Sequence, residues 1–379
     1  MLQFLKRHVR STLNDSGQVV VVAAVTIPVL LGMAGMAIDV GSYASNRRQI
    51  QNAADSIALA AAQELPDESA ALAAGQQWAT RNGIALGDVT ITIDASTEDG
   101  STPWARAAIS RQHAFAFMKV VGIDSKAVSA RATAEKASFG GSNGIVPWTI
   151  TEATQDAAGL GELVVMKYDA DGANIGNFGA IRIDGPGSNT YNTSVKYGSA
   201  GYACAETADN CTAGACPGVY PDQCAETAPE CDGAECTPET GNMIGPTATG
   251  VDFRVNYTMA ECDTFDEVFT APDPVTGESN INPDCNPWTD GPGKCTSDTD
   301  LCSRRVIIIP VVDTFGEGTS DPATIQRFAL MFLEGYDDGK CQGNSCEIQG
   351  RFVKADINTR ALAGSYDENA LIHFTRLSE

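Results

Sequence analysis

The chain has 379 residues, of which 43% are apolar and 7% aromatic, and this allows two or three domains with packed cores. Its formal net charge is −23. This charge argues against nucleic acid as a partner, because contact with a phosphate backbone needs a basic face.

A basic N-terminal segment, residues 1–17, precedes a long apolar run, Val19–Ile38, that has twenty residues and no charge. At about 1.5 Å per residue, a helix of this length covers roughly 30 Å, the hydrocarbon thickness of a bilayer. We therefore predict a transmembrane helix over residues 18–40. The residues that define this predicted anchor are Val19, Pro28, Gly32, Ile38 and Asp39.

Other interpretations fit the apolar run less well. A cleaved signal peptide usually has an apolar region of ~7–15 residues, which is shorter than this run, and no clear Ala-x-Ala site follows it directly. An interfacial helix needs a charged face, which the run lacks. The Lys and Arg residues before the run favour a cytoplasmic N-terminus, with the rest of the chain exported.

The segment after the anchor, residues 41–137, predicts a helical stalk with a small α+β module. Apolar residues recur at helical spacing until Pro66 stops the helix, and alternating segments follow later. The expected elements after the first helix are a helix over 67–80, strands over 89–94 and 104–111, a short helix over 113–121 and a strand over 127–133.

Residues 138–144, with the sequence SFGGSNG, are typical of a linker. Beyond them, residues 145–379 predict a β-rich domain, so the fold class of the whole chain is α+β. The strands expected there lie over 145–150, 163–168, 180–184, 305–312, 328–334 and 346–356.

An acidic, cysteine-rich insertion, residues 201–302, interrupts this domain and holds 19 acidic against two basic residues. A solvated loop region and a surface that binds divalent cations both fit this composition. Two copies of the pattern C-x6-C-x4-C begin at Cys204 and at Cys224. Zinc is a poor alternative to disulfides for these cysteines, because neither a CxxC pair nor a nearby His is present.

The even number of cysteines, all after residue 203, predicts a disulfide framework in an oxidising compartment, with the pairing left open. This agrees with export of the C-terminal part. The twelve candidates are Cys204, Cys211, Cys216, Cys224, Cys231, Cys236, Cys262, Cys285, Cys295, Cys302, Cys341 and Cys346.

One stretch of the N-terminal third is specific to a family. The apolar helix opens at Gly17 and ends with Ala-Ile-Asp39, and a run of Ala follows soon after. The motif between them is Gln51, Asn52, Ala53, Ala54 and Asp55. This arrangement resembles the N-terminal segment of the TadE/TadG-like proteins of the Tad (Flp) pilus system. The close match covers about residues 15–65, and a weaker likeness continues to about residue 137.

The resemblance implies a bacterial cell-membrane protein that crosses the membrane once and takes part in pilus assembly or in surface attachment and adhesion. It implies pilus or pilus-assembly proteins as partners, besides the membrane. Type IV pilins carry a Glu five positions after the Gly at which they are cut, and Val22 stands there in this chain. The resemblance therefore does not extend to the processing site of a pilin.

No arrangement of residues predicts catalysis, a small-molecule substrate or an organic cofactor: the chain has three His and no P-loop. Calcium is the one cofactor to consider. Asp169, Asp171 and Asn174 could offer oxygen ligands on a tight loop, although an Asx turn explains the same residues. The alternative hypothesis is therefore an anchored extracellular module whose binding depends on calcium.

Overall fold

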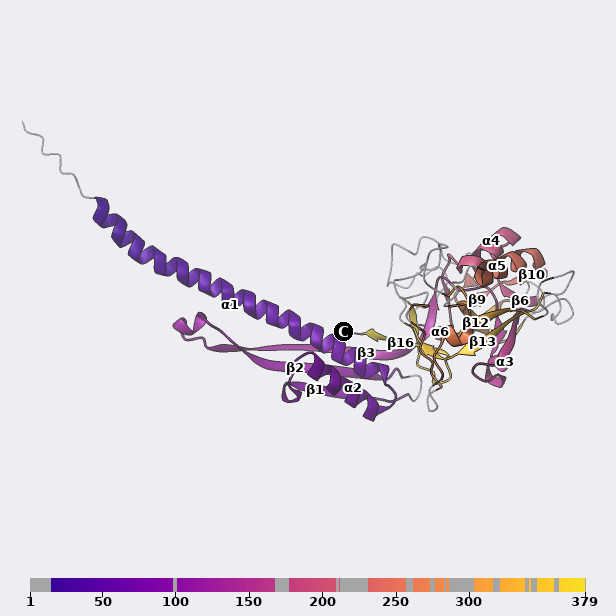
Figure 1. Cartoon of the computed structure of the whole chain (residues 1–379), viewed down its shortest axis with the longest axis horizontal. Helices are drawn as coiled ribbons and strands as arrows, with labels where there is room; N and C mark the ends of the chain where they lie inside the picture. Colours follow the sequence, from indigo (N-terminus) through magenta and orange to yellow (C-terminus); the bar gives the residue numbers. More distant parts are fainter. Residues whose placement is uncertain are drawn as a thin grey trace, which may run out of the picture.

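The computed structural model is a rod that carries a head at one end (Figure 1). The rod is a long helix with a sheet along its second half, and the head contains a second sheet. The residues described by the structure are 15–97, 101–167, 177–208, 211, 231–256, 262–272, 277–282, 284–285, 303–315, 321–337, 341, 346–357 and 361–378.

The first helix, α1 (Asp15–Gln63), is continuous over 49 residues. Its two halves have opposite surroundings. The first half exposes its apolar side chains, whereas the second half buries residues at helical spacing. The buried side chains of the second half include Ile50, Ala53, Ala54, Ile57, Ala58 and Ala61. Pro28 lies inside the helix, and Figure 1 shows α1 as one gently curved helix without a break.

The helix α2 (Glu68–Arg81) packs against α1 and has the ends that the sequence predicts. Asp67 caps its N-terminus by accepting hydrogen bonds from the backbone N–H groups of Ser69 and Ala70, both at 2.9 Å. After its C-cap residue, Gly83 adopts a φ of +67°, which an L side chain rarely allows.

Three antiparallel strands form the stalk sheet beside α1: β1 (Val89–Asp94), β2 (Trp104–Ala114) and β3 (Ser125–Ser142). The face of this sheet toward α1 is made largely of small side chains, which lets the helix approach closely. The buried alanines of this face are Ala105, Ala107, Ala132 and Ala134. The predicted α+β module is thus present, with strands longer than expected.

The short helix predicted over residues 113–121 is wrong for most of its length. β2 continues through Ala114, because His113 and Ala114 pair with Lys126 and Ser125. Only one turn of 3₁₀-helix, η3 (Met118–Val121), remains at the end of the hairpin. Strand pairing therefore overrides the local helical pattern.

The linker predicted over residues 138–144 is also wrong, because β3 runs on through residue 142 and is buried there. Its glycines allow neighbouring strands to approach. A Cβ atom on Gly140 would lie 2.7 Å from the backbone of Ala363. This end of β3 pairs with β7 (Ala203–Cys204) and with β15 (Leu362–Gly364), so it joins the stalk to the head.

The C-terminal part of the chain returns to the stalk, which the predicted domain 145–379 does not include. The strand β16 (Ile372–Leu377) pairs antiparallel with β3, and β14 (Ala355–Asp356) extends the sheet from β16. The ring of Phe139 in β3 packs edge-on against Phe328 of the head at 5.2 Å. The stalk and the head are therefore joined through β3 and packed together at the Phe139–Phe328 contact.

The head sheet has the strand order β4-β11-β12-β13-β5. Its second strand, β11, is buried at all seven positions. These strands are β4 (Ile150–Thr151), β5 (Leu163–Lys167), β11 (Val306–Val312), β12 (Ala323–Tyr336) and β13 (Ile348–Val353). The other head elements are α3 (Glu152–Ala157), β6 (Asn177–Ile181), α4 (Ser188–Tyr197), β8 (Cys231–Asp232), β9 (Glu235–Cys236), β10 (Pro238–Thr240), α5 (Ile244–Asn256) and α6 (Phe265–Val268).

The helix α5 lies inside the insertion that we expected to be loop. Its helical pattern is hidden by Gly245 and Pro246 in its first turn, where Pro is tolerated, and by Gly250. A Cβ on Gly250 would lie 2.2 Å from the side chain of Val195 in α4. The close packing of two helices therefore requires the glycine.

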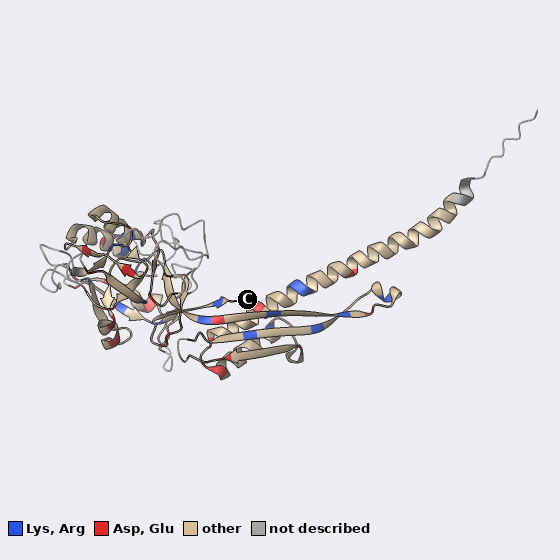
Figure 2. Ribbon diagram, turned by 180° about the vertical axis from the view of Figure 1, so that it is seen from behind, with Lys and Arg blue, Asp and Glu red and all other residues tan. Residues whose placement is uncertain are grey.

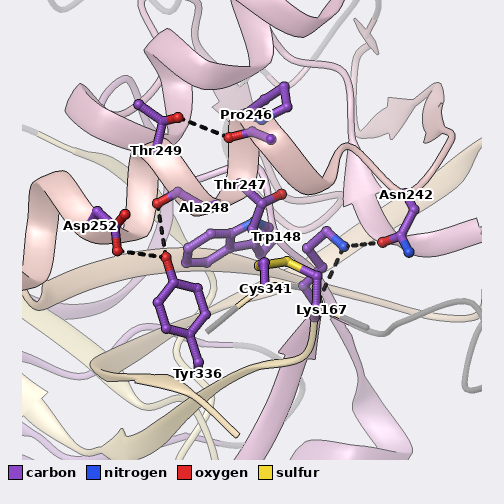
Figure 3. The surroundings of a disulfide bond; sticks show 12 residues. Trp148, Lys167, Asn242, Pro246, Thr247, Ala248, Thr249, Asp252, Tyr336 and Cys341 are labelled. Carbon is purple, nitrogen blue, oxygen red and sulfur yellow. Dashed lines mark hydrogen bonds between the residues drawn. A yellow bond between two sulfur atoms is a disulfide. The ribbon is translucent and has the colours of Figure 1, made fainter. Parts of the chain in front are cut away.

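Buried polar side chains connect the sheet of the head to α4 and α5 (Figure 3). The indole N–H of Trp148 donates to the hydroxyl of Tyr191 at 2.8 Å, and burial raises the pKa of Tyr191 to about 12. The ammonium of Lys167, 1% exposed, donates to Asn242 Oδ1 at 2.8 Å. The hydroxyl of Tyr336 donates to a carboxylate oxygen of Asp252 at 2.8 Å. The buried groups of Trp148, Tyr191 and Lys167 each have a hydrogen-bond partner, as a packed core requires, whereas Tyr336 is partly buried and Asp252 is exposed.

Eight of the twelve candidate cysteines are paired in the described residues, as Cys204–Cys211, Cys231–Cys236, Cys262–Cys285 and Cys341–Cys346. The two copies of the repeat pair differently, because the first copy joins its first two cysteines and the second copy joins its last two. The repeat therefore does not predict the pairing. Candidates outside the described residues are Cys216, Cys224, Cys295 and Cys302.

Gly140→Ala should destabilise the junction of stalk and head, because the new Cβ would meet strand backbone that has no room to move. We expect a loss of about 1–3 kcal/mol in the free energy of unfolding, measured by denaturant titration of the full chain in detergent micelles. Gly87→Ala is the matched control, since nothing lies within 4 Å of its added Cβ. Equal stability of the two variants would contradict the close approach.

The double variant Cys262→Ala, Cys285→Ala should lower the stability of the head. This pair, separated by 23 residues, closes the longest of the four described loops, and a loop of that size contributes about 3 kcal/mol. We expect a lower melting temperature than for Cys204→Ala with Cys211→Ala, whose separation is 7 residues. A larger drop in melting temperature for the Cys204–Cys211 variant would contradict the expectation that the Cys262–Cys285 disulfide stabilises the head more.

Candidate functional site

The candidate site is the contact between α1 and the hairpin tip, which we define as residues 115–124 between β2 and β3. Asp39 lies at its centre and is 3% exposed. Its carboxylate accepts hydrogen bonds from three successive backbone N–H groups: Ala116 at 2.9 Å, Phe117 at 2.8 Å and Met118 at 2.7 Å. Charge-assisted hydrogen bonds of this kind are among the stronger ones in proteins.

Gly35 lies one helical turn before Asp39 and makes room for the hairpin tip. A Cβ atom at Gly35 would lie 2.7 Å from Cγ of Phe117. The absence of a side chain therefore lets the Phe117 ring lie directly on the helix. Gly32, in contrast, has nothing within 4 Å, so its glycine has no equivalent packing role within the described residues.

A polar cluster on the C-terminal side of Asp39 along α1 orients the hairpin on the helix. Arg111 Nη2 donates to Asn46 Oδ1 at 2.8 Å, and this fixes the Asn46 amide so that its Nδ2 donates to His113 Nδ1 at 2.9 Å. The proton of His113 is then on Nε2, which is 3.3 Å from the hydroxyl of Ser42. His113 also packs edge-on against Tyr43 at 5.8 Å, so it serves as a positioning residue.

The motif Gln51–Asp55 forms the helix face that packs on the stalk sheet. Gln51 Nε2 donates to Asp55 Oδ1 at 2.8 Å and to the carbonyl of Arg131 in β3 at 3.0 Å. Ala53 and Ala54 are buried against the sheet, and Asn52 is exposed. The motif thus has a structural role in holding the helix to the sheet.

The predicted anchor lies entirely on the first half of α1. Val19 is 65% and Ile38 58% exposed, and Figure 2 shows a long stretch of this part of α1 without a red or blue residue. Among the described residues, α1 is the one helix long and apolar enough to cross a membrane by length and composition. Asp39 and the hairpin tip follow directly after this apolar half.

A second cluster lies where the stalk meets the head. The ammonium of Lys136, 2% exposed, donates to the carbonyl of Gln63 at 3.0 Å. It also lies 3.5 Å from a carboxylate oxygen of Glu278 and 3.6 Å from one of Asp356. Burial, the largest influence, raises the pKa of Asp356 to about 6. The cluster therefore ties α1 and β3 to the head by charge.

His373 borders the Lys136 cluster. Its Nε2 lies 2.9 Å from the carbonyl oxygen of Asp367, and its ring stacks on Tyr366 at 5.2 Å. Burial lowers its pKa to about 4, so the ring is neutral near pH 7. One atom each of Glu278, Asp356 and His373 could face a shared ion, but the Lys136 ammonium already forms ion pairs with both carboxylates, and we assign the cluster to structure.

The proposed calcium ligands Asp169, Asp171 and Asn174 lie outside the described residues. The sequence did not predict the hairpin tip as part of the site. Its signal was present in the run FAFMKVVGID, residues 115–124, whose apolar residues do not alternate as in a half-buried strand. The backbone donors to Asp39 leave no signal in the sequence, because any residue except Pro offers the same N–H group.

Residues 17–64 match the family model described as putative Flp pilus-assembly TadE/G-like. The match ends at the C-terminal end of α1 and covers both Asp39 and the Gln51–Asp55 motif. Neither the curated proteins nor the solved structures include a significant match. The predicted resemblance is confirmed for this segment, which associates the chain with Tad pilus assembly.

Replacing Asp39 with Asn should loosen the hairpin tip, because an amide accepts through one oxygen only and its NH2 group would face backbone donors. We expect faster hydrogen–deuterium exchange at the amides of Ala116, Phe117 and Met118, measured by mass spectrometry on the full chain in lipid nanodiscs. Asp124→Asn, with the same charge change at an exposed side chain nearby, is the control. Unchanged exchange in Asp39→Asn would show that the carboxylate does not hold the tip.

Proposed function

We propose that this chain is a structural protein of the bacterial cell envelope that acts in Tad-type pilus assembly or surface attachment. Residues 18–40 anchor it in the cell membrane as an uncleaved signal-anchor, with the N-terminus in the cytoplasm. The stalk and the head lie outside the membrane. The proposal assigns the chain no catalytic reaction.

The observation that carries this proposal is the continuity of α1. The exposed apolar half, Val19–Ile38, passes without interruption into the half that packs on the stalk sheet. A bilayer would cover the apolar half, because exposing apolar side chains to water over this length of helix is unfavourable. The family match over residues 17–64 includes both halves and supports a role beside pilus components.

The head supports an exported location. Four disulfides occur in its described residues, and disulfides persist in oxidising compartments. The positive flank before the apolar run favours the same orientation. A rigid stalk that carries this head suits contact with pilus subunits or with the cell exterior, and we propose such proteins as its partners.

A clean chromosomal deletion should reduce the number of pili and the adhesion of cells, and the full chain expressed in trans should restore both. Pili are counted by electron microscopy, and adhesion is measured by retention on glass. Immunoblotting of the complemented strain controls for expression level. Normal pili and normal adhesion in the deletion strain would refute the pilus role.

Orientation is tested separately by fusing alkaline phosphatase after the last residue, since this enzyme folds only where its disulfides form. We expect phosphatase activity in intact cells, because the C-terminal strand β16 pairs in the stalk sheet, which the proposal places outside. A fusion that is expressed but inactive would contradict export of the stalk and head.

A further inference from the structure

The hairpin tip exposes a cluster of large apolar side chains that the stalk does not cover. Val120 is 90% exposed, Val121 59%, Phe117 47% and Ile123 45%. Exposed apolar side chains scattered singly are normal on protein surfaces, but a contiguous group marks a contact. Gly122, with a φ of +85°, reverses the chain directly after Val121, so both valines stand at the far end of the hairpin.

The position of the tip along α1 indicates what covers this group. The contacts of the tip with the helix are at Gly35 and Asp39, where the apolar run ends. Gly35 precedes Ile38 by three residues, so at about 1.5 Å per residue the tip lies about 5 Å to the apolar side of the end of the run. Figure 1 shows the hairpin running along α1 toward its N-terminal half.

Lys119 within the apolar tip, and Lys126 and Tyr43 beside it on the stalk, add basic and aromatic groups to this region. Lys119 is exposed between the apolar residues, and Lys126 lies with its ammonium 5.4 Å from the ring of Tyr43. Aromatic rings and Lys side chains are the groups that concentrate at the boundary between lipid and water. Apolar groups that reach about 5–10 Å into the headgroup region are typical of interfacial segments.

We propose that the hairpin tip inserts into the lipid–water interface of the leaflet from which α1 emerges. This inference rests on the proposed membrane anchoring of the chain. The tip and the helix then contact the bilayer at two places, and the Asp39 hydrogen bonds fix their relative height. Two contacts fix the angle between the stalk and the membrane. A single helix that crosses the bilayer would leave this angle free.

The test is photocrosslinking of the full chain in vesicles of phosphatidylethanolamine and phosphatidylglycerol. The crosslinker p-benzoylphenylalanine replaces Val120 in one variant, Leu30 in a second and Leu86 in a third. Leu30 reports on the anchor. Leu86 is the matched control, because it is exposed and apolar like Val120, whereas its neighbours Gly87 and Asp88 line a surface hollow with Arg47 and Gln51, beyond the end of the apolar run.

After irradiation, mass spectrometry should find lipid adducts at positions 120 and 30, with a yield at 120 several-fold above that at 86. Adducts at 30 without adducts at 120 would overturn the inference and leave the anchor intact. An absence of adducts at both 30 and 120 would overturn the anchor and the inference together. A crosslink from position 120 to a second copy of the chain, or equal lipid yields at 120 and 86, would also contradict insertion of the tip.

Discussion

The carboxylate of Asp39 connects α1 to the hairpin tip, and the rest of the structure depends on this connection. It is the first charged residue after the apolar run and accepts three backbone hydrogen bonds from the hairpin tip. A buried carboxylate needs such partners, because burying an unpaired charge is costly. If the hairpin separated from the helix, this charge would lose its hydrogen-bond partners. The three hydrogen bonds therefore fix the position of the stalk sheet along α1 at the hairpin tip.

Above this point, the stalk is held by small side chains instead of charges. Alanines on α1 face alanines on β2 and β3, and the close approach that they permit turns a single helix into a rigid unit with the sheet. β3 then carries the connection onward, since its far end pairs with β7, β15 and β16, which all follow the stalk in the sequence. The head is thus fixed to the stalk by shared strands and by the Lys136 cluster.

The sequence predicted the elements in which local pattern and tertiary packing agree. The apolar run, the continued helix, the helix that follows Pro66 and the strand β1 all have the expected form. The sequence did not predict the elements whose structure depends on tertiary packing alone. The glycines at residues 140 and 141 have the composition of a linker, yet they occur because other strands approach too closely for a Cβ. Gly250 is required by close packing for the same reason, and it obscures the helical pattern of α5 in the sequence. The disulfide pairing depends on distances that the repeat does not encode.

Cryo-electron microscopy of the full chain in lipid nanodiscs tests the central claim most directly, because it shows the bilayer and the stalk together. The account predicts that α1 crosses the disc over residues 19–38, that the disc surface lies at the level of Asp39, and that the hairpin tip lies in that surface. A helix lying flat on the disc, or a disc surface far from Asp39 with the hairpin tip in water, would contradict it.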